Sequence, residues 1–172
     1  TFDEFRQIGW VTGQRLFRHY RQDGFDTATG KVELYSRQLE EWGFEPLPTF
    51  HEPPESPLSA PELARDYPLV LTNSKVAGYV HSGGRQIPSL RDRHPEPLVT
   101  INAATAAAHG IVEGDWVTVQ TKRGSVRQKA ALSTEIDPRV IIMEHGWYFP
   151  ERDDDLHGWA ESNQNVLTSN DP

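Results

Sequence analysis

The proline-rich stretch at residues 45–61 constrains the fold of this 172-residue chain more than any other feature. Proline lacks a backbone N–H and fixes φ, so such a stretch cannot form the interior of a helix or a sheet. We therefore expect an extended connector that lies along a surface. The connector predicts two parts: an N-terminal extension with the connector at residues 1–61 and a domain at residues 62–172. Its six prolines are Pro46, Pro48, Pro53, Pro54, Pro57 and Pro61.

The segment before the connector shows little regular patterning. Aromatic residues are scattered through residues 1–30 without a period of two or 3.6, which predicts an irregular chain with at most one helical turn. In residues 31–42 the apolar side chains recur at helical spacing, and Gly43 follows as a stop signal. We expect a short amphipathic helix there.

The chain after the connector consists of short runs rich in β-forming residues, separated by turn residues. A helix is expected at residues 103–109, because Asn102 is a good N-cap and Gly110 suits the position after the helix end. Residues 122–125 are typical of a hairpin turn. The pattern predicts a mainly β fold with short helices, in a compact barrel or sandwich. The expected strands lie at residues 69–71, 98–101, 116–121, 126–132 and 140–143.

Composition excludes several classes of function. A net charge of -8 argues against a general nucleic-acid partner, which requires a basic surface. The chain contains no cysteine, so it can supply neither a thiolate nucleophile nor ligands for an iron–sulfur cluster. Its longest aliphatic run, residues 140–143, is far shorter than the roughly 20 residues of a membrane span. No export signal is recognisable, and the location stays open.

The loop after the expected strand at residues 69–71 is the first candidate site. Glycines there allow close approach of the backbone to a ligand, while hydroxyls, a lysine and an arginine fork bind phosphate oxygens. These residue types predict a local anion site. A solvated surface loop of ordinary turn residues is the alternative interpretation. The candidate residues are Thr72, Ser74, Lys75, His81, Ser82 and Arg85.

Several separate segments agree, in order, with one known family. Together they resemble the C-terminal molybdopterin dinucleotide-binding domain of the dimethyl sulfoxide reductase family. The resemblance implies a double-psi β-barrel that covers a cofactor of two pterin dinucleotides with molybdenum or tungsten. The segments are Leu71-Thr72 with His81-Ser82-Gly83-Gly84-Arg85, Ile101-Asn102 to Ala106, Gly110-Ile111 to Trp116-Val117, Gly124-Ser125, His145-Gly146-Trp147, Pro150-Glu151 and residues 162–168.

The resemblance also assigns roles to candidate residues. The loop at residues 72–85 would bind the pyrophosphate and pterin heteroatoms, and its lysine, histidine and arginine would stabilise charge on the reduced pterin. Asn163 and Gln164 carry amides that match the alternating donor and acceptor edge of a pterin, and for Asn163 a structural turn is the less favoured alternative. In His145-Gly146-Trp147 the glycine would allow close approach and the histidine would donate a hydrogen bond, with a satisfied interior histidine as the alternative.

The same resemblance limits what the chain can do alone. The residue that ligates the metal and the iron–sulfur cysteines of the family belong to regions that nothing here matches. The chain is therefore expected to hold part of the cofactor, with guanine as the expected base of the dinucleotide, and to be inactive by itself. Its expected partners are the remaining domains of the catalytic subunit and an iron–sulfur electron-transfer subunit. The alternative hypothesis is a standalone β-barrel binding module that uses the connector for docking.

A metal site built from histidines is a weaker hypothesis. No pair among them has the spacing of i and i+4 on a helix or a tight strand spacing, either of which would place two ring nitrogens on one ion. The acidic cluster at residues 151–155 likewise lacks the alternating ligands of a calcium loop. The histidines in question are His81, His94, His109, His145 and His157.

Overall fold

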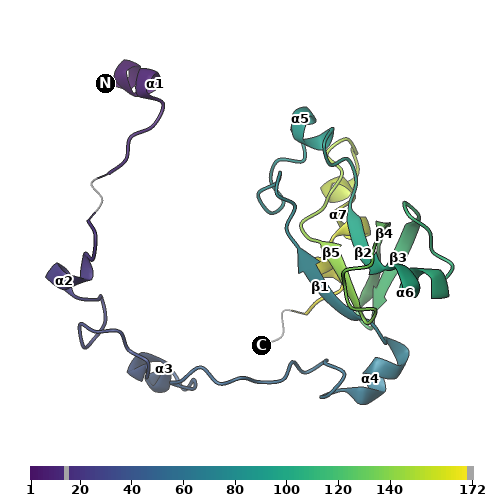
Figure 1. The fold of residues 1–172 in the computed structure, drawn as a ribbon, viewed down its shortest axis with the longest axis horizontal. Helices are drawn as coiled ribbons and strands as arrows, with labels where there is room; N and C mark the ends of the chain where they lie inside the picture. Colours follow the sequence, from purple (N-terminus) through teal and green to yellow (C-terminus); the bar gives the residue numbers. More distant parts are fainter. Residues whose placement is uncertain (14–15, 170–172) are drawn as a thin grey trace. The chain divides into compact units, whose positions relative to one another are not determined.

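The computed structural model describes residues 1–13 and 16–169. Its contacts divide the chain into two compact units, Thr1–His51 and a second unit that begins at Glu52. The division falls inside the proline-rich stretch, and the predicted domain boundary after residue 61 stays a prediction. Each unit is described by itself below (Figure 1).

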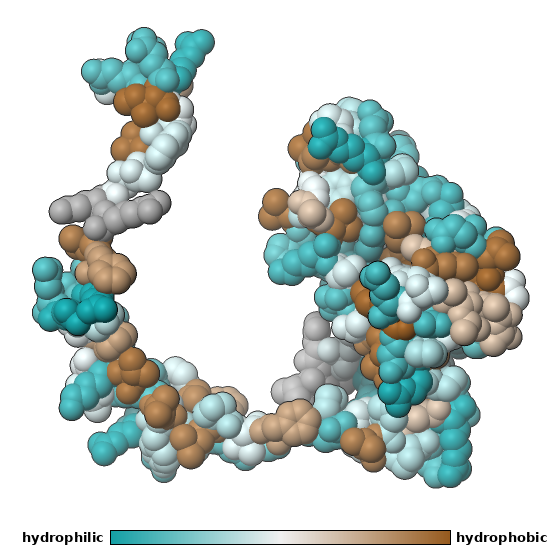
Figure 2. Space-filling view, in the orientation of Figure 1, coloured by the Kyte–Doolittle hydropathy of each residue, from teal (hydrophilic) through white to brown (hydrophobic). Residues whose placement is uncertain are grey.

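The helices of the first unit are short, and their residues form no buried core. Its helices are α1 (Phe2–Ile8), α2 (Tyr20–Asp23) and α3 (Arg37–Glu41), and none contains a buried residue. Figure 2 shows hydrophobic residues, in brown, on the surface of this unit. Large side chains that are mostly exposed include Phe2, Trp10, Phe17, Leu34, Trp42 and Phe50.

The helix predicted at residues 31–42 is shorter than expected. Helix α3 begins at Arg37 because Ser36 caps it, with the Ser36 hydroxyl accepting a hydrogen bond from the Leu39 N–H at 3.3 Å. Gly43 follows the helix with φ of 81°, as the stop signal predicted. Val32 precedes the helix and is exposed. Short helices depend on packing of their apolar face, and among residues 1–13 and 16–51 none is buried to supply it.

The second unit is built on one five-stranded sheet in the order β1-β5-β2-β4-β3. The sheet curls into a half-barrel (Figure 1), and all five predicted strands are present. This confirms a mainly β fold with short helices. In the part of the chain that the structure describes, β1 and β3 are the sheet edges, and the double-psi connectivity stays a prediction. The strands are β1 (Val70–Ser74), β2 (Leu98–Asn102), β3 (Trp116–Thr121), β4 (Gly124–Ser133) and β5 (Val140–Glu144).

The strand pairing is mixed. β1 runs parallel to β5, and β2 runs parallel to β4. β2 is antiparallel to β5, and β3 is antiparallel to β4. Thr121 pairs with Gly124, so the predicted hairpin turn consists of Lys122 and Arg123.

The helices of this unit are short. The predicted helix α6 (Ala103–Ala108) is confirmed: the Asn102 side chain accepts a hydrogen bond from the Ala104 N–H, and Gly110 follows with φ of 67°. Among the residues described, no helix has the length and apolar character that crossing a membrane requires. The other helices are α4 (Pro61–Asp66), α5 (Pro88–Arg91), α7 (Trp159–Ser162) and the 3-10 helices η1 (Asp155–Gly158) and η2 (Gln164–Val166).

Two hydrophobic clusters support the second unit. The larger one fills the curl of the sheet and includes Val99 and Met143, which have no exposed surface. The smaller one consists of the buried rings of Tyr79, Trp147 and Phe149. Its members come from the loop after β1 and the segment after β5, so it joins the two segments that carry most of the candidate site.

An ion cluster attaches the connector to the hairpin between β3 and β4. Both oxygens of the Glu55 carboxylate accept hydrogen bonds from the Arg123 guanidinium, at 2.6 and 2.7 Å, and the Lys122 ammonium lies at 2.5 Å. These bonds lower the pKa of Glu55 from 4.5 to about 2, mainly through Arg123 and then Lys122. The second half of the proline-rich stretch is therefore tied to the sheet.

We expect Asn102→Ala to destabilise the second unit. The substitution removes the cap of α6 and also the hydrogen bond from the Asn102 amide to the Ile136 carbonyl at 2.7 Å. A cap and a buried hydrogen bond together are worth about 1–3 kcal/mol. Urea denaturation measures the loss. The exposed Asn73→Ala is the control, and equal losses in both variants would contradict this account of the cap.

We expect the stabilisation by Glu55 to disappear in acid. Because its pKa in the folded protein is about 2, below the ordinary 4.5, the unfolded chain binds more protons between these pH values. The stabilisation is therefore complete above pH 4.5 and declines as pH falls toward 2. Denaturant titrations of wild type and Glu55→Gln should differ at neutral pH and converge in acid. Glu52→Gln is the control, and a difference that grows in acid would contradict the pairing.

Candidate functional site

The register between β1 and β5 brings two loops together. Ser74 at the end of β1 pairs with Glu144 at the end of β5, and the two strands are parallel. The loop that starts at Lys75 and the segment that starts at His145 therefore leave the sheet side by side. β2 is antiparallel to β5, so its beginning at Leu98 lies at the same end of the sheet.

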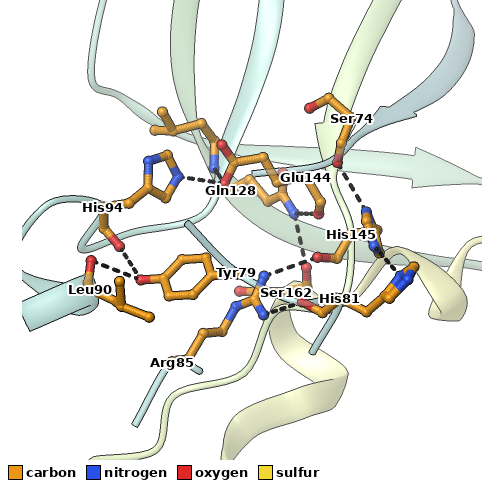
Figure 3. Close-up of polar contacts among 11 residues, drawn as sticks. Ser74, Tyr79, His81, Arg85, Leu90, His94, Gln128, Glu144, His145 and Ser162 are labelled. Carbon is orange, nitrogen blue, oxygen red and sulfur yellow. Dashed lines mark hydrogen bonds and ion pairs between the residues drawn. The ribbon is translucent and has the colours of Figure 1, made fainter. Parts of the chain in front are cut away.

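A pair of histidines joins the two loops. The Nδ1 atom of His81 lies 3.1 Å from Nε2 of His145, and Nδ1 of His145 lies 3.0 Å from the Ser74 carbonyl oxygen (Figure 3). A carbonyl can only accept, so Nδ1 of His145 carries the proton. In neutral His145 the Nε2 atom then accepts from Nδ1–H of His81. The His145 ring is thus oriented by the end of β1.

Arg85 contacts the backbone of both histidines. Its guanidinium donates to the carbonyl of His81 at 2.6 Å and to the carbonyl of His145 at 3.1 Å (Figure 3). The ring centroids of Tyr79 and Trp147 lie 4.6 and 4.7 Å from its central carbon. Arg85 is 1% exposed, and burial lowers its pKa from the ordinary value. The guanidinium remains charged even so, because arginine is not deprotonated in proteins.

The backbones of the two loops touch at Gly146. Its φ is 69°, and a Cβ added there would lie 3.0 Å from the Ser82 nitrogen and 3.2 Å from the His81 carbonyl oxygen. Only glycine fits such a close approach at a positive φ. The close neighbour of Gly146 in this structure is the loop at residues 81–82, and its predicted approach to a cofactor stays a prediction.

The C-terminal segment joins the same end of the sheet. The Asn163 amide donates to the Trp147 carbonyl at 3.3 Å, and its oxygen accepts from the Asn165 N–H. The Gln128 amide donates to the carbonyls of Glu144 and Ser162, at 2.9 and 3.0 Å. Asn163 is buried, and its bond to the Trp147 carbonyl holds that residue in place. Its bond from the Asn165 N–H forms the structural turn that was the alternative from the sequence.

The predicted site residues fall into three groups by exposure. The exposed group consists of Thr72, Lys75, His81 and Ser82, whose side chains are available to a ligand. Ser74, His145 and Gly146 are half-buried between the strand ends, and Gln164 is half-buried at the start of η2. The buried group, which holds the loops together, consists of Arg85, Trp147 and Asn163.

Sequence reasoning missed several residues of this end of the sheet. Glu144 is buried and accepts from the Leu98 N–H, and His94 Nε2 lies 2.8 Å from the same carboxylate oxygen. The Tyr79 hydroxyl donates to the His94 carbonyl at 2.8 Å. A carboxylate directly after an apolar strand was the available signal for Glu144. His94 gave none, because its partner is fifty positions away in the sequence.

Two grooves lie elsewhere on the second unit. One of about 410 Å³ and one of about 300 Å³ share Tyr67, Leu69, Leu71 and Thr121 in their linings, between the edge strands β1 and β3. Their linings include none of the predicted site residues. Within residues 1–13 and 16–169, no group of three histidine, aspartate or glutamate side chains could hold a metal ion.

Comparison with known proteins identifies the family of the second unit. The family model described as the molydopterin dinucleotide binding domain matches residues 69–172. Dopamine dehydroxylase from Eggerthella lenta is 40% identical over 152 residues, covering 84% of this chain and 15% of that protein. Dimethyl sulfoxide/trimethylamine N-oxide reductase from Cereibacter sphaeroides is 36% identical over 132 residues, covering 72% of this chain and 16% of that protein.

A solved structure agrees as well. Acetylene hydratase from Pelobacter acetylenicus superposes with a TM-score of 0.78 at 32% identity, covering 87% of this chain and 21% of that chain. The half-barrel and its loops thus define a domain that binds a molybdopterin-type cofactor carrying molybdenum or tungsten. The chain belongs to the molydopterin dinucleotide binding domain family, as found in enzymes of the dimethyl sulfoxide reductase family. It spans only 15–16% of the two curated relatives named above.

We expect Gly146→Ala to separate the two loops. The added methyl group would meet the backbone of His81 and Ser82, and alanine is strained at a φ of 69°. The expected loss of stability is about 1–3 kcal/mol, measured by urea denaturation. Gly78→Ala in the same loop is the matched control, because a Cβ there meets nothing within 4 Å. A neutral effect at Gly146 would contradict the contact.

Proposed function

We propose that the exposed residues at the joined ends of β1 and β5 bind one pterin dinucleotide of a bis(pterin dinucleotide) cofactor. One observation carries the proposal: three segments far apart in the sequence, at residues 74–85, 145–147 and 163, meet at one end of the sheet through hydrogen bonds of their backbones and side chains. These are the segments from which the cofactor role was predicted.

The residues present fit an anionic, heteroatom-rich ligand. Lys75 offers an ammonium, Ser82 a hydroxyl and His81 the Nε2 atom of its ring, and all three side chains are exposed. Phosphate oxygens accept hydrogen bonds from such donors, and charged bonds are about twice as strong as neutral ones. Thr72 adds a second hydroxyl near the end of β1. When bound, the cofactor would supply the metal at which oxygen-atom or two-electron transfer takes place.

The chain's own residues would hold and orient the cofactor. His145 is held by Ser74, so its Nε2 sets the position of the His81 ring. Asn163 and Trp147 are buried and support the loops from behind. In this proposal the side-chain amide of Gln164, at the start of η2, also binds the pterin. We propose guanine as the base of the dinucleotide.

We propose further that the chain is the C-terminal domain of a catalytic subunit. The metal ligand and any iron–sulfur cysteines would then lie in other parts of that subunit, and an iron–sulfur subunit would exchange electrons with it. The exposed aromatic side chains of the first unit support this, because apolar surface of this extent marks contact with further protein. By itself the 172-residue chain should bind cofactor and catalyse nothing.

The relatives also bear on the substrate and on the alternative role. Relatives that share this domain are named dopamine dehydroxylase and acetylene hydratase, which indicates different substrates. We therefore propose that substrate choice is set outside this domain. All are enzymes much longer than this chain, and nothing in the comparisons favours a standalone interaction barrel.

We expect Ser82→Ala and Lys75→Met each to weaken binding of guanosine diphosphate or of the pterin dinucleotide about tenfold, the loss of one bond to a charged group. Isothermal titration calorimetry of the 172-residue chain measures the affinity. Arg139→Gln is the matched control, because Arg139 is an exposed cation that precedes the opposite end of β5. Unchanged affinity in both loop variants, or an equal loss in the control, would contradict the proposed site.

A further inference from the structure

Arg85 occupies an unusual place for a residue predicted to bind phosphate. Its side chain is 1% exposed, and two of its three guanidinium nitrogens donate to backbone carbonyls. The third nitrogen, Nε, is buried without a hydrogen-bond partner. A ligand at the surface of the loops has therefore no nitrogen of Arg85 to bind.

The two carbonyls belong to the two residues whose rings form the histidine pair. One oxygen is that of His81 and the other that of His145, and the two rings are 3.1 Å apart at their nearest nitrogens. One rigid fork thus fixes the backbone at both ends of the pair (Figure 3). Arginine suits this task because its donors lie in one plane at fixed angles, which a lysine ammonium cannot reproduce.

The backbone at His81 needs such a tether. Its φ is 51°, in the left-handed region that residues other than glycine seldom occupy. Strained conformations of this kind persist only where surrounding contacts hold them, and they concentrate at functional sites. The short bond of 2.6 Å from Arg85 to the His81 carbonyl is one such contact. The close approach of Gly146 is the other.

The aromatic rings keep the guanidinium in place. Tyr79 and Trp147 both contact it with their rings, and the two rings meet each other edge to face with centroids 5.9 Å apart. A buried cation is costly unless it is paired, and ring faces together with two carbonyl oxygens offset that cost. The chain therefore keeps a buried charge, which is costly in free energy, in contact with the backbone of the candidate site.

We propose that Arg85 is a positioning residue, which aligns the His81–His145 pair for the cofactor without touching the cofactor itself. This inference rests on the proposed function and changes the role that the sequence predicted for Arg85. Lys75, Ser82 and the outer nitrogen of His81 are then the groups that meet the ligand. Arg85 sets the distance and angle between them and His145.

Arg91 offers a matched control. Its guanidinium carbon lies 5.1 Å from the ring centroid of the same Trp147 and 6.0 Å from that of Phe149. It is also largely buried, with 19% of its side chain exposed, and it pairs with Glu151. The guanidinium of Arg91 donates to the Glu151 carboxylate at 2.9 Å and not to the carbonyls of His81 and His145, which accept from Arg85. It therefore shares the stacking of Arg85 but has no direct hold on the histidine pair.

The experiment compares Arg85→Met, Arg85→Lys and Arg91→Met in the 172-residue chain. Nitrogen-15 NMR of the imidazoles reports the protonated Nδ1 atoms of His81 and His145, and calorimetry reports the affinity for guanosine diphosphate. We expect both Arg85 variants to lose the paired imidazole signature and to bind about tenfold more weakly. Arg91→Met should keep both properties.

Arg85→Lys is the decisive variant, because it keeps a positive charge at the same place and tests the proposal even if Arg85→Met fails to fold. Retained affinity with a retained imidazole signature would overturn the proposal, since charge alone would then suffice. An equal loss in Arg91→Met would also overturn it, because general damage to the aromatic cluster would then explain the effect. If the wild-type chain binds no nucleotide, the proposed function fails, while the imidazole signature still tests Arg85.

Discussion

The parallel pairing of β1 with β5 is the constraint on which the rest of the site depends. It places the ends of two strands, Ser74 and Glu144, side by side although seventy positions separate them in the chain. Every later contact follows from that register. A shift by one residue would turn the side chains of β5 to the opposite face, and Glu144 would leave the core. His145 would also lose the Ser74 carbonyl that orients its ring.

The site divides its work between exposed and buried residues. Exposed donors on the loop after β1 can meet a ligand directly, whereas Arg85, Trp147 and Asn163 are buried and hold the loops. Such a division suits a cofactor domain, because ligand donors must stay accessible while their positions are fixed by packing. The buried carboxylate of Glu144, with His94 and the Leu98 N–H, extends the same support to the start of β2.

Local patterns predicted the strands and helix α6 well, because each depends on neighbours in the sequence. The five β-rich runs became the five strands, and Asn102 caps α6 as its side chain predicts. The helix expected at residues 31–42 was too long, because a helical pattern forms a helix only where its apolar face is packed. The candidate residues were found mainly by residue type and by resemblance, and most of them do meet in space.

The sequence by itself determined the elements, the absence of cysteine chemistry and the loop that carries the polar residues. The tertiary structure alone decided which of those residues stay exposed. Arg85 and Ser82 are close in sequence and both are hydrophilic, yet Arg85 is buried against two aromatic rings and Ser82 is exposed. The physical reason is that burial depends on segments that strand pairing brings together. The residues near Arg85 in the chain do not determine that Trp147, which follows β5, packs against it.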